Sequence, residues 1–78
     1  MNSDFELSLG QNIRRIREEK KLTQQELSAK LQLNNCDITR STLAKIEVGQ
    51  RHIYPDEIFW IRKILDVSYD DLFPKKSN

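Results

Sequence analysis

The sequence predicts an all-α fold, and three observations lead to this prediction. The 78 residues include only two glycines and two prolines, which leaves little material for β-hairpins or long loops. Apolar residues recur at helical spacings of three and four along most of the chain. Residues that commonly cap helices stand between these segments. Because so short a chain forms one small domain at most, we expect a single domain over residues 1–78, with a core at about 8–73 and loose ends at 1–7 and 74–78.

Five helices are expected, and the first two precede a polar turn. The first covers about residues 8–20, where one apolar stripe runs along an otherwise charged helix: Leu9, Ile13 and Ile16. The second covers about residues 24–32 and begins with a capping box, in which the Thr23 hydroxyl accepts a hydrogen bond from the backbone of Glu26 and the Glu26 side chain reaches back. Its apolar positions are Leu27 and Leu31.

The other three helices follow that turn. Residues 33–37 contain two Asn and one Asp, whose side chains compete for backbone hydrogen bonds and favour a loop. A third helix begins after Thr39 and stops at Gly49. A fourth opens at Tyr54-Pro55-Asp56-Glu57, and a short fifth runs from Ser68 to Phe73 before Pro74. The expected inner faces are Leu43 and Ile46 in the third helix, and Ile58, Ile61 and Leu65 in the fourth.

Cysteine content and hydropathy point to a soluble, cytoplasmic protein. Cys36 is the single cysteine, so an intrachain disulfide is impossible. The longest apolar run, Ile58 to Ile61, is far shorter than the roughly 20 residues of a membrane-spanning helix. The first residues show neither the basic stretch nor the apolar stretch of an export signal.

Charge is distributed unevenly although the formal net charge is only +1. Residues 10–52 hold nine Lys and Arg against five Asp and Glu, whereas residues 53–73 hold two against five. A basic part and an acidic part would orient the molecule toward a polyanion. An ordinary solvated surface explains the same asymmetry.

Catalysis and metal binding have little support in the sequence. His52 is the single histidine, and only Cys36 stands near it in sequence, which makes neither a metal site nor a Cys–His nucleophile pair. The neighbouring carboxylates Asp56–Glu57 and Asp70–Asp71 suit helix starts, since adjacent residues do not face one another on a helix. We therefore expect no enzyme activity, no cofactor and no metal.

The third helix carries the residues that point to a function. With Leu43 and Ile46 turned inward, its other faces hold small hydroxyl and basic residues: Thr39, Arg40, Ser41, Thr42 and Lys45. A helix that enters the DNA major groove does so with its N-terminal residues foremost. Arg and Lys suit guanine, and Ser and Thr hydroxyls are versatile donors and acceptors. These side chains are therefore expected to reach base edges and flanking phosphates.

The same segments resemble the Cro/phage-repressor, or XRE-type, helix-turn-helix family. The resemblance is carried by Ile13-Arg14-Arg15-Ile16-Arg17, by Leu22-Thr23-Gln24-Gln25-Glu26-Leu27 and by Ile38-Thr39-Arg40-Ser41-Thr42-Leu43-Ala44-Lys45-Ile46-Glu47-Val48-Gly49. It extends through Val67-Ser68-Tyr69-Asp70-Asp71-Leu72-Phe73 and covers about residues 9–73. It implies a five-helix domain in which helices 2 and 3 form the DNA-binding unit.

The resemblance also implies individual roles. Gln24 would contact a phosphate and brace the reading helix. The groove-facing, base-reading positions would be Thr39, Arg40, Ser41 and Lys45. Further phosphate contacts would come from Thr42, Gln50 and Arg51. Arg17 and Glu47 match a pair that joins helix 1 to helix 3 through a partly buried ion pair in many relatives, so we assign Arg17 to the scaffold.

The turn between helices 2 and 3 departs from the family pattern. Relatives usually have a tight turn with a glycine, whereas residues 32–37 here are longer and contain none. One hypothesis is that Asn34 and Asn35 add phosphate contacts. The alternative is an inert surface loop.

An aromatic pair in the fourth helix suggests a contact between two copies of the chain. If Ile58, Ile61 and Leu65 form the inner face of the fourth helix, then Trp60 falls away from the core, beside Ile64 and Phe59. A self-complementary patch there would form a two-fold dimer and match a palindromic operator. The alternative is that Trp60 wraps into the edge of its own core.

The sequence thus predicts a sequence-specific regulator of transcription that binds double-stranded DNA as a dimeric repressor. An antitoxin that holds a toxin through a protein-binding surface and regulates its own synthesis is an alternative. A controller protein of a restriction–modification system is another alternative.

Overall fold

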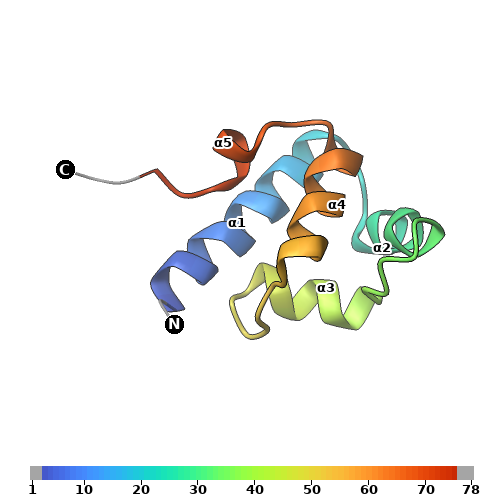
Figure 1. The fold of residues 1–78 in the computed structure, drawn as a ribbon, viewed down its shortest axis with the longest axis horizontal. Helices are drawn as coiled ribbons and strands as arrows, with labels where there is room; N and C mark the ends of the chain where they lie inside the picture. The colour runs from blue at the N-terminus through green and yellow to red at the C-terminus, as the bar shows by residue number, and fades with distance from the viewer. Residues whose placement is uncertain (1–2, 76–78) are drawn as a thin grey trace.

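A computed structural model describes residues 3–75, which form five α-helices and no strand (Figure 1). In chain order the helices are α1 (Ser3–Glu19), α2 (Gln24–Leu33), α3 (Arg40–Glu47), α4 (Pro55–Leu65) and α5 (Tyr69–Leu72). The predicted fold class and order of helices are therefore confirmed. None of the helices in this part of the chain is long and apolar enough to cross a membrane.

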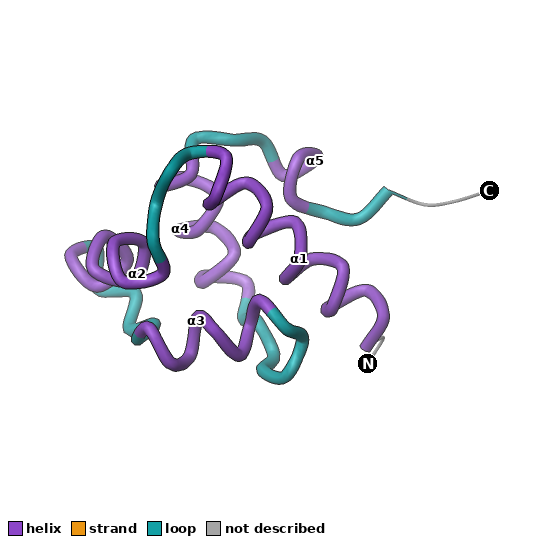
Figure 2. Tube along the Cα trace, turned by 180° about the vertical axis from the view of Figure 1, so that it is seen from behind, coloured by secondary structure: helices purple, strands orange, loops and turns teal. Residues whose placement is uncertain are grey.

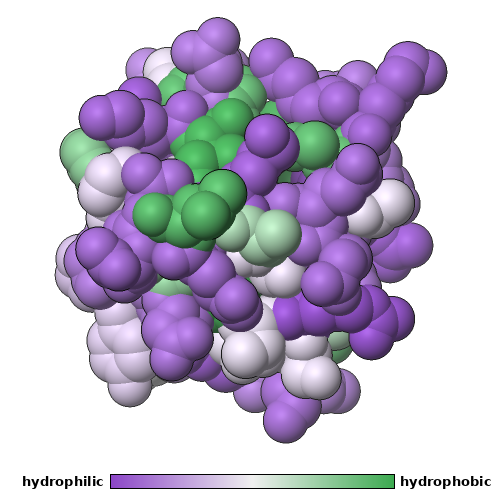
Figure 3. Space-filling model, turned by 90° about the vertical axis from the view of Figure 1, so that its right-hand side faces the viewer, coloured by the Kyte–Doolittle hydropathy of each residue, from purple (hydrophilic) through white to green (hydrophobic). Residues whose placement is uncertain are grey.

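The helices form a bundle with α3 along one edge. α1 packs against α3, α4 and α5, whereas α2 packs against α3 and α4. Seen from behind, α3 crosses below α1 and α4, and α2 lies at the end of the bundle (Figure 2). The face at that end is largely hydrophilic, with some hydrophobic side chains among the polar ones (Figure 3). One side of α3 is thus packed on the bundle and the other faces outward.

Apolar side chains from all five helices meet in one core. The positions predicted for the first three helices are all buried: Leu9, Ile13, Ile16, Leu27, Leu31, Leu43 and Ile46. In α4, Ile61 and Leu65 are buried as expected, but Ile58 is only half-buried. The turns and α5 complete the core with Cys36, Ile38, Ile53 and Leu72. Burial raises the pKa of the Cys36 thiol, which makes its reactive thiolate form scarcer at neutral pH.

Most helix ends are set by local signals that the sequence shows. The capping box at Thr23 is present, since its hydroxyl accepts from the Glu26 N–H and its own N–H donates to the Glu26 carboxylate. α3 ends before Gly49, whose φ of +76° lies in the left-handed region that glycine adopts most readily. α4 ends in the same way without a glycine, because Asp66 adopts a φ of +58°.

The N-terminal end of α1 differs from the prediction. The helix begins at Ser3, so the loose end expected over residues 1–7 is wrong from residue 3 onward, and residues 1–2 lie outside the described part. Tertiary contacts hold this first segment: the Phe5 ring lies 6.0 Å from the Phe73 ring, and Leu7 lies against Gly49. At the other end, Pro74 and Lys75 follow α5 outside any helix, and 76–78 lie outside the described residues.

Candidate nucleic-acid interface

The outward side of α3 carries the residues that the sequence singled out. Leu43 and Ile46 are fully buried, so the helix presents its opposite flank to solvent. The exposed residues of this flank are Arg40, Ser41 and Lys45, with Thr42 half-buried beside them. No other segment of residues 3–75 covers these three side chains. Two cations and a hydroxyl therefore stand on one accessible helix face.

The start of α3 is fixed by its own threonines. The Thr39 hydroxyl accepts a hydrogen bond from the Thr42 backbone N–H at 3.2 Å and lies 3.1 Å from the Thr42 hydroxyl. Thr39 is thus the N-cap of the helix, and its side chain serves the backbone as well as facing outward. This arrangement places Arg40 in the first turn of α3.

The buried Arg17 and Glu47 lie face to face. Arg17 donates from Nε to Glu47 Oε2 at 2.7 Å and from Nη2 to Oε1 at 3.0 Å. The two residues are 6% and 2% exposed. The hydrogen bond to Glu47 raises the pKa of Arg17, so the guanidinium stays charged. The family resemblance implies this pair, and its burial removes Arg17 from the outer surface.

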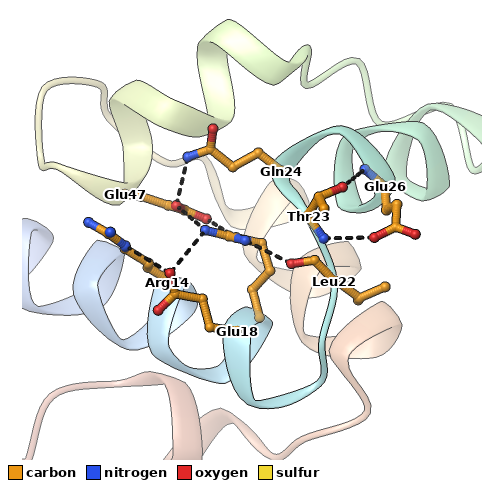
Figure 4. Close-up of polar contacts among 8 residues, drawn as sticks. Arg14, Glu18, Leu22, Thr23, Gln24, Glu26 and Glu47 are labelled. Carbon is orange, nitrogen blue, oxygen red and sulfur yellow. Dashed lines mark hydrogen bonds and ion pairs between the residues drawn. The ribbon is translucent and has the colours of Figure 1, made fainter.

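Glu47 also connects α2 to α3. Gln24, the first residue of α2, donates from Nε2 to Glu47 Oε1 at 3.0 Å (Figure 4). Arg17 also donates a hydrogen bond from its third nitrogen, Nη1, to the Leu22 carbonyl at 2.7 Å, just before the capping box of α2. One carboxylate therefore holds α1, α2 and α3 together, and it fixes the angle between α2 and α3 from the end opposite their connecting turn. Gln24 braces α3 as expected.

The turn between α2 and α3 replaces the missing glycine with an asparagine. Asn35 adopts a φ of +61°, which Asn tolerates better than most residues. Asn34 donates its side-chain amide to the Lys30 carbonyl at 2.9 Å and so helps to end α2. Both asparagines are exposed, and the Asn34 side-chain amide is bonded to the backbone. Leu33, beside them, is 85% exposed.

The two residues of the loop after α3 that are expected to contact phosphates differ in their surroundings. Gln50 is exposed. Arg51 is half-buried and donates from Nη1 to the Glu57 carboxylate of α4 and to the His52 carbonyl. The hydrogen bond to Glu57 raises the pKa of Arg51, and the guanidinium lies 5.4 Å from the centre of the Tyr54 ring. The charge of Arg51 is therefore already paired within the protein.

The same loop is tied to α1 by contacts that the sequence did not indicate. The Glu6 carboxylate lies 2.9 Å from His52 Nδ1 and accepts from the Ile53 backbone N–H at 3.4 Å. Residues 6 and 52 are too far apart in sequence for any local pattern to reveal this contact. Within residues 3–75, no three His, Cys, Asp or Glu side chains form a group that could hold a metal ion.

The aromatic pair Phe59 and Trp60 lies on α4, not on the helix that carries the outward flank. Phe59 is 38% exposed and meets Trp60 edge to face, with ring centres 5.2 Å apart. Trp60 and Ile64 are half-buried and pack against the core. The Lys63 ammonium lies 5.4 Å from the Trp60 ring centre. Trp60 therefore wraps partly into its own core, and Phe59 is the more exposed of the two rings.

Comparisons with known proteins agree with this geometry. A family model described as helix-turn-helix matches residues 13–72. A protein of Bacillus subtilis (strain 168), named as the uncharacterized HTH-type transcriptional regulator YqaE, is 38% identical over 68 residues, which is 87% of this chain and 54% of that protein. The chain thus spans about half the length of this relative.

Among solved structures, the crystal structure of the DNA-binding domain of BldD has the same fold. The TM-score is 0.79 at 19% identity, and the likeness covers 95% of this chain and 100% of that one. The capped pair α2 and α3, joined through Glu47, lies inside the segment that the family model matches. The chain belongs to the helix-turn-helix family.

Proposed function

We propose that this chain binds double-stranded DNA in a sequence-specific manner and regulates transcription, as a repressor. The observation that carries the proposal is the uncovered flank of α3 with Arg40, Ser41 and Lys45, on a helix fixed through Glu47. The printed name of the Bacillus subtilis relative and the DNA-binding domain of BldD support the same role. In this proposal the protein acts in the cytoplasm, and it binds DNA without catalysing a reaction.

In the proposed complex, α3 lies in the major groove with its N-terminal turn leading. Arg40 and Lys45 bind guanine edges, and Ser41 and Thr39 add hydroxyl contacts to neighbouring bases. Gln24, Thr42 and Gln50 contact phosphates on either side and set the register of the helix. Arg51 joins them only when a phosphate competes with Glu57 for its guanidinium.

Selection of bound sites from random duplex DNA tests the proposal. The native chain is expected to enrich one motif. Arg40→Ala should cost about 1–3 kcal/mol at one base pair of that motif and relax the preference there. Lys30→Ala removes an exposed cation from the far end of α2 and is the matched control, with an unchanged motif. Failure of the native chain to enrich any sequence would overturn the proposal.

We also propose a homodimer on a palindromic operator, formed through the α4 surface of Phe59, Trp60 and Ile64. The exposed Phe59 ring supports this, because it lies on a helix that does not carry the reading flank. Sedimentation against concentration is the test. Phe59→Ser should weaken self-association, whereas Leu33→Ser, which alters a more exposed residue on α2, should not. A monomer at every concentration would refute the dimer.

A further inference from the structure

A hollow in the surface lies where α1, the start of α2 and the start of α3 meet. Its volume is about 480 Å³. The residues that line it come from all three helices and the capping residue of α2: Arg14, Arg17, Thr23, Gln24, Gln25 and Arg40. None of them is acidic. The family resemblance implies roles for Arg17, Gln24 and Arg40, but none for Arg14.

The accessible charge of this hollow comes from two arginines on different helices, Arg14 of α1 and Arg40 of α3. Arg17 contributes little, since its guanidinium is buried and paired with Glu47. Arg40 is exposed, and no carboxylate within residues 3–75 forms an ion pair with it. Arg14 lies 3.4 Å from Glu18, and the two side chains are 57% and 56% exposed. An exposed pair of this kind contributes little and exchanges readily for another partner. The hollow therefore offers two accessible guanidinium groups.

The first residues of α2 add neutral donors to the same place. Gln24 and Gln25 stand at the start of α2, where backbone N–H groups have no partner within the helix. The Gln24 amide is directed to Glu47. Guanidinium and N–H donors around an open hollow suit a tetrahedral anion whose other side stays in solvent.

We propose that this hollow receives a phosphate of the DNA backbone and that Arg14 of α1 contacts it. The proposal rests on the proposed function and extends the interface from α2 and α3 to α1. Arg40 is the first residue of α3, the helix that enters the major groove in the proposed complex, and it also lines the hollow. The DNA strand that borders the groove at this end of α3 therefore passes beside the hollow. Arg14 then helps to position the protein on DNA and contributes equally to the affinity for every DNA sequence.

Arg15 provides a matched control for Arg14. It forms the same kind of exposed pair one residue on, with Glu19 at 3.3 Å and a side chain that is 55% exposed. Both arginines border a smaller depression near Val48. Arg15 does not line the large hollow, and its other surroundings are Val67 and Asp71 on the α5 side. Replacing either arginine removes one charge and one ion pair from the same helix.

The experiment measures DNA affinity at several salt concentrations for the native chain, Arg14→Gln and Arg15→Gln. The probes are the duplex enriched by selection and an unrelated duplex of equal length. Arg14→Gln is expected to weaken both complexes by about fivefold to tenfold and to lower the slope of log Kd against log salt by about one. Arg15→Gln should leave the slope unchanged. Equal thermal unfolding midpoints for the two variants would show that stability is not the cause.

A second pair of variants tests the same contact from the other side. Glu18→Gln releases Arg14 from its partner, and Glu19→Gln releases Arg15. Glu18→Gln should tighten binding more than Glu19→Gln. The phosphate site would be overturned if Arg14→Gln had the same effect as Arg15→Gln, and Glu18→Gln the same effect as Glu19→Gln. If the native chain still binds its selected duplex, the proposed function stands. A native chain that binds no duplex would overturn both.

Discussion

The guanidinium of Arg17 and the carboxylate of Glu47 are joined by two hydrogen bonds of 2.7 and 3.0 Å across the α1–α3 contact. Both residues are buried. A buried ion pair need not stabilise a fold, but removal of one partner leaves an uncompensated charge inside the protein. Here the same carboxylate also accepts from Gln24. The pair therefore bears on the position of α3 as well as on the stability of the domain.

Loss of either partner of this pair should be strongly destabilising. Glu47→Leu and Arg17→Met are each expected to lower the free energy of unfolding by about 3–5 kcal/mol. The double variant should lose far less than the sum, because two apolar residues of similar volume leave no buried charge. Chemical denaturation of the four proteins measures the coupling. Additive losses would show that the two side chains do not depend on one another.

The contact between α1 and α3 depends on a glycine inside α1. A Cβ atom at Gly10 would lie 2.1 Å from the Ile46 carbonyl oxygen, which is too close for two atoms without a bond. Gly10→Ala should therefore lower stability by about 1–3 kcal/mol through overpacking, although alanine favours a helix by about 1 kcal/mol. Gln11→Ala, at an exposed neighbouring position, is the control and should be close to neutral. A higher unfolding midpoint for Gly10→Ala would contradict this account.

Helix starts could be predicted from the sequence because their signals are local. The hydroxyls of Thr23, Thr39 and Ser68 each accept from a backbone N–H three residues later, within the reach of a short motif. The same holds for the apolar stripes, whose spacing repeats over one or two turns. The exposed flank of α3 follows from its stripe, since burial of Leu43 and Ile46 leaves the opposite side outward.

Features held by distant residues could not be predicted in this way. The first turns of α1 have no continuous stripe, and they depend on Phe73 and on the loop after α3. The family resemblance implies a phosphate contact for Arg51, and no local pattern in the sequence shows that Glu57, from the next helix, pairs with it. Arg14 lies beside the hollow only because three helices meet there. Each of these requires the tertiary arrangement.

Acid should weaken the domain partly through two capping carboxylates. Hydrogen bonds from the Thr23 backbone and hydroxyl hold the pKa of Glu26 below its usual 4.5. Those from the Ser68 backbone and hydroxyl hold the pKa of Asp71 below its usual 3.8. Because the folded-state pKa values are lowered, both contributions are complete above the unfolded values and are lost as the pH falls through the folded ones.

The variants Glu26→Gln and Asp71→Asn test this origin of acid sensitivity. Each should be less stable than the native chain near neutral pH and should approach it as the pH falls below about 4. Asp70→Asn, beside Asp71 but outside the capping box, is the control. Unfolding midpoints measured across this range decide the matter. A gap that stays constant with pH would show that the charged form of these carboxylates is not what stabilises the caps.

Variants of Asn35, in the turn between α2 and α3, can distinguish a role in the backbone conformation from a role in DNA binding. Asn35 adopts a left-handed backbone conformation, which lowers the stability of the fold by about 1 kcal/mol or more when the residue has a Cβ atom. Asn35→Gly should therefore keep or raise stability, whereas Asn35→Ala should lose about 1 kcal/mol. If the side chain only closes the turn, both variants should bind the selected duplex as the native chain does, once each is folded. A similar loss of affinity in both variants, with a lower salt slope, would instead assign Asn35 to the phosphate backbone.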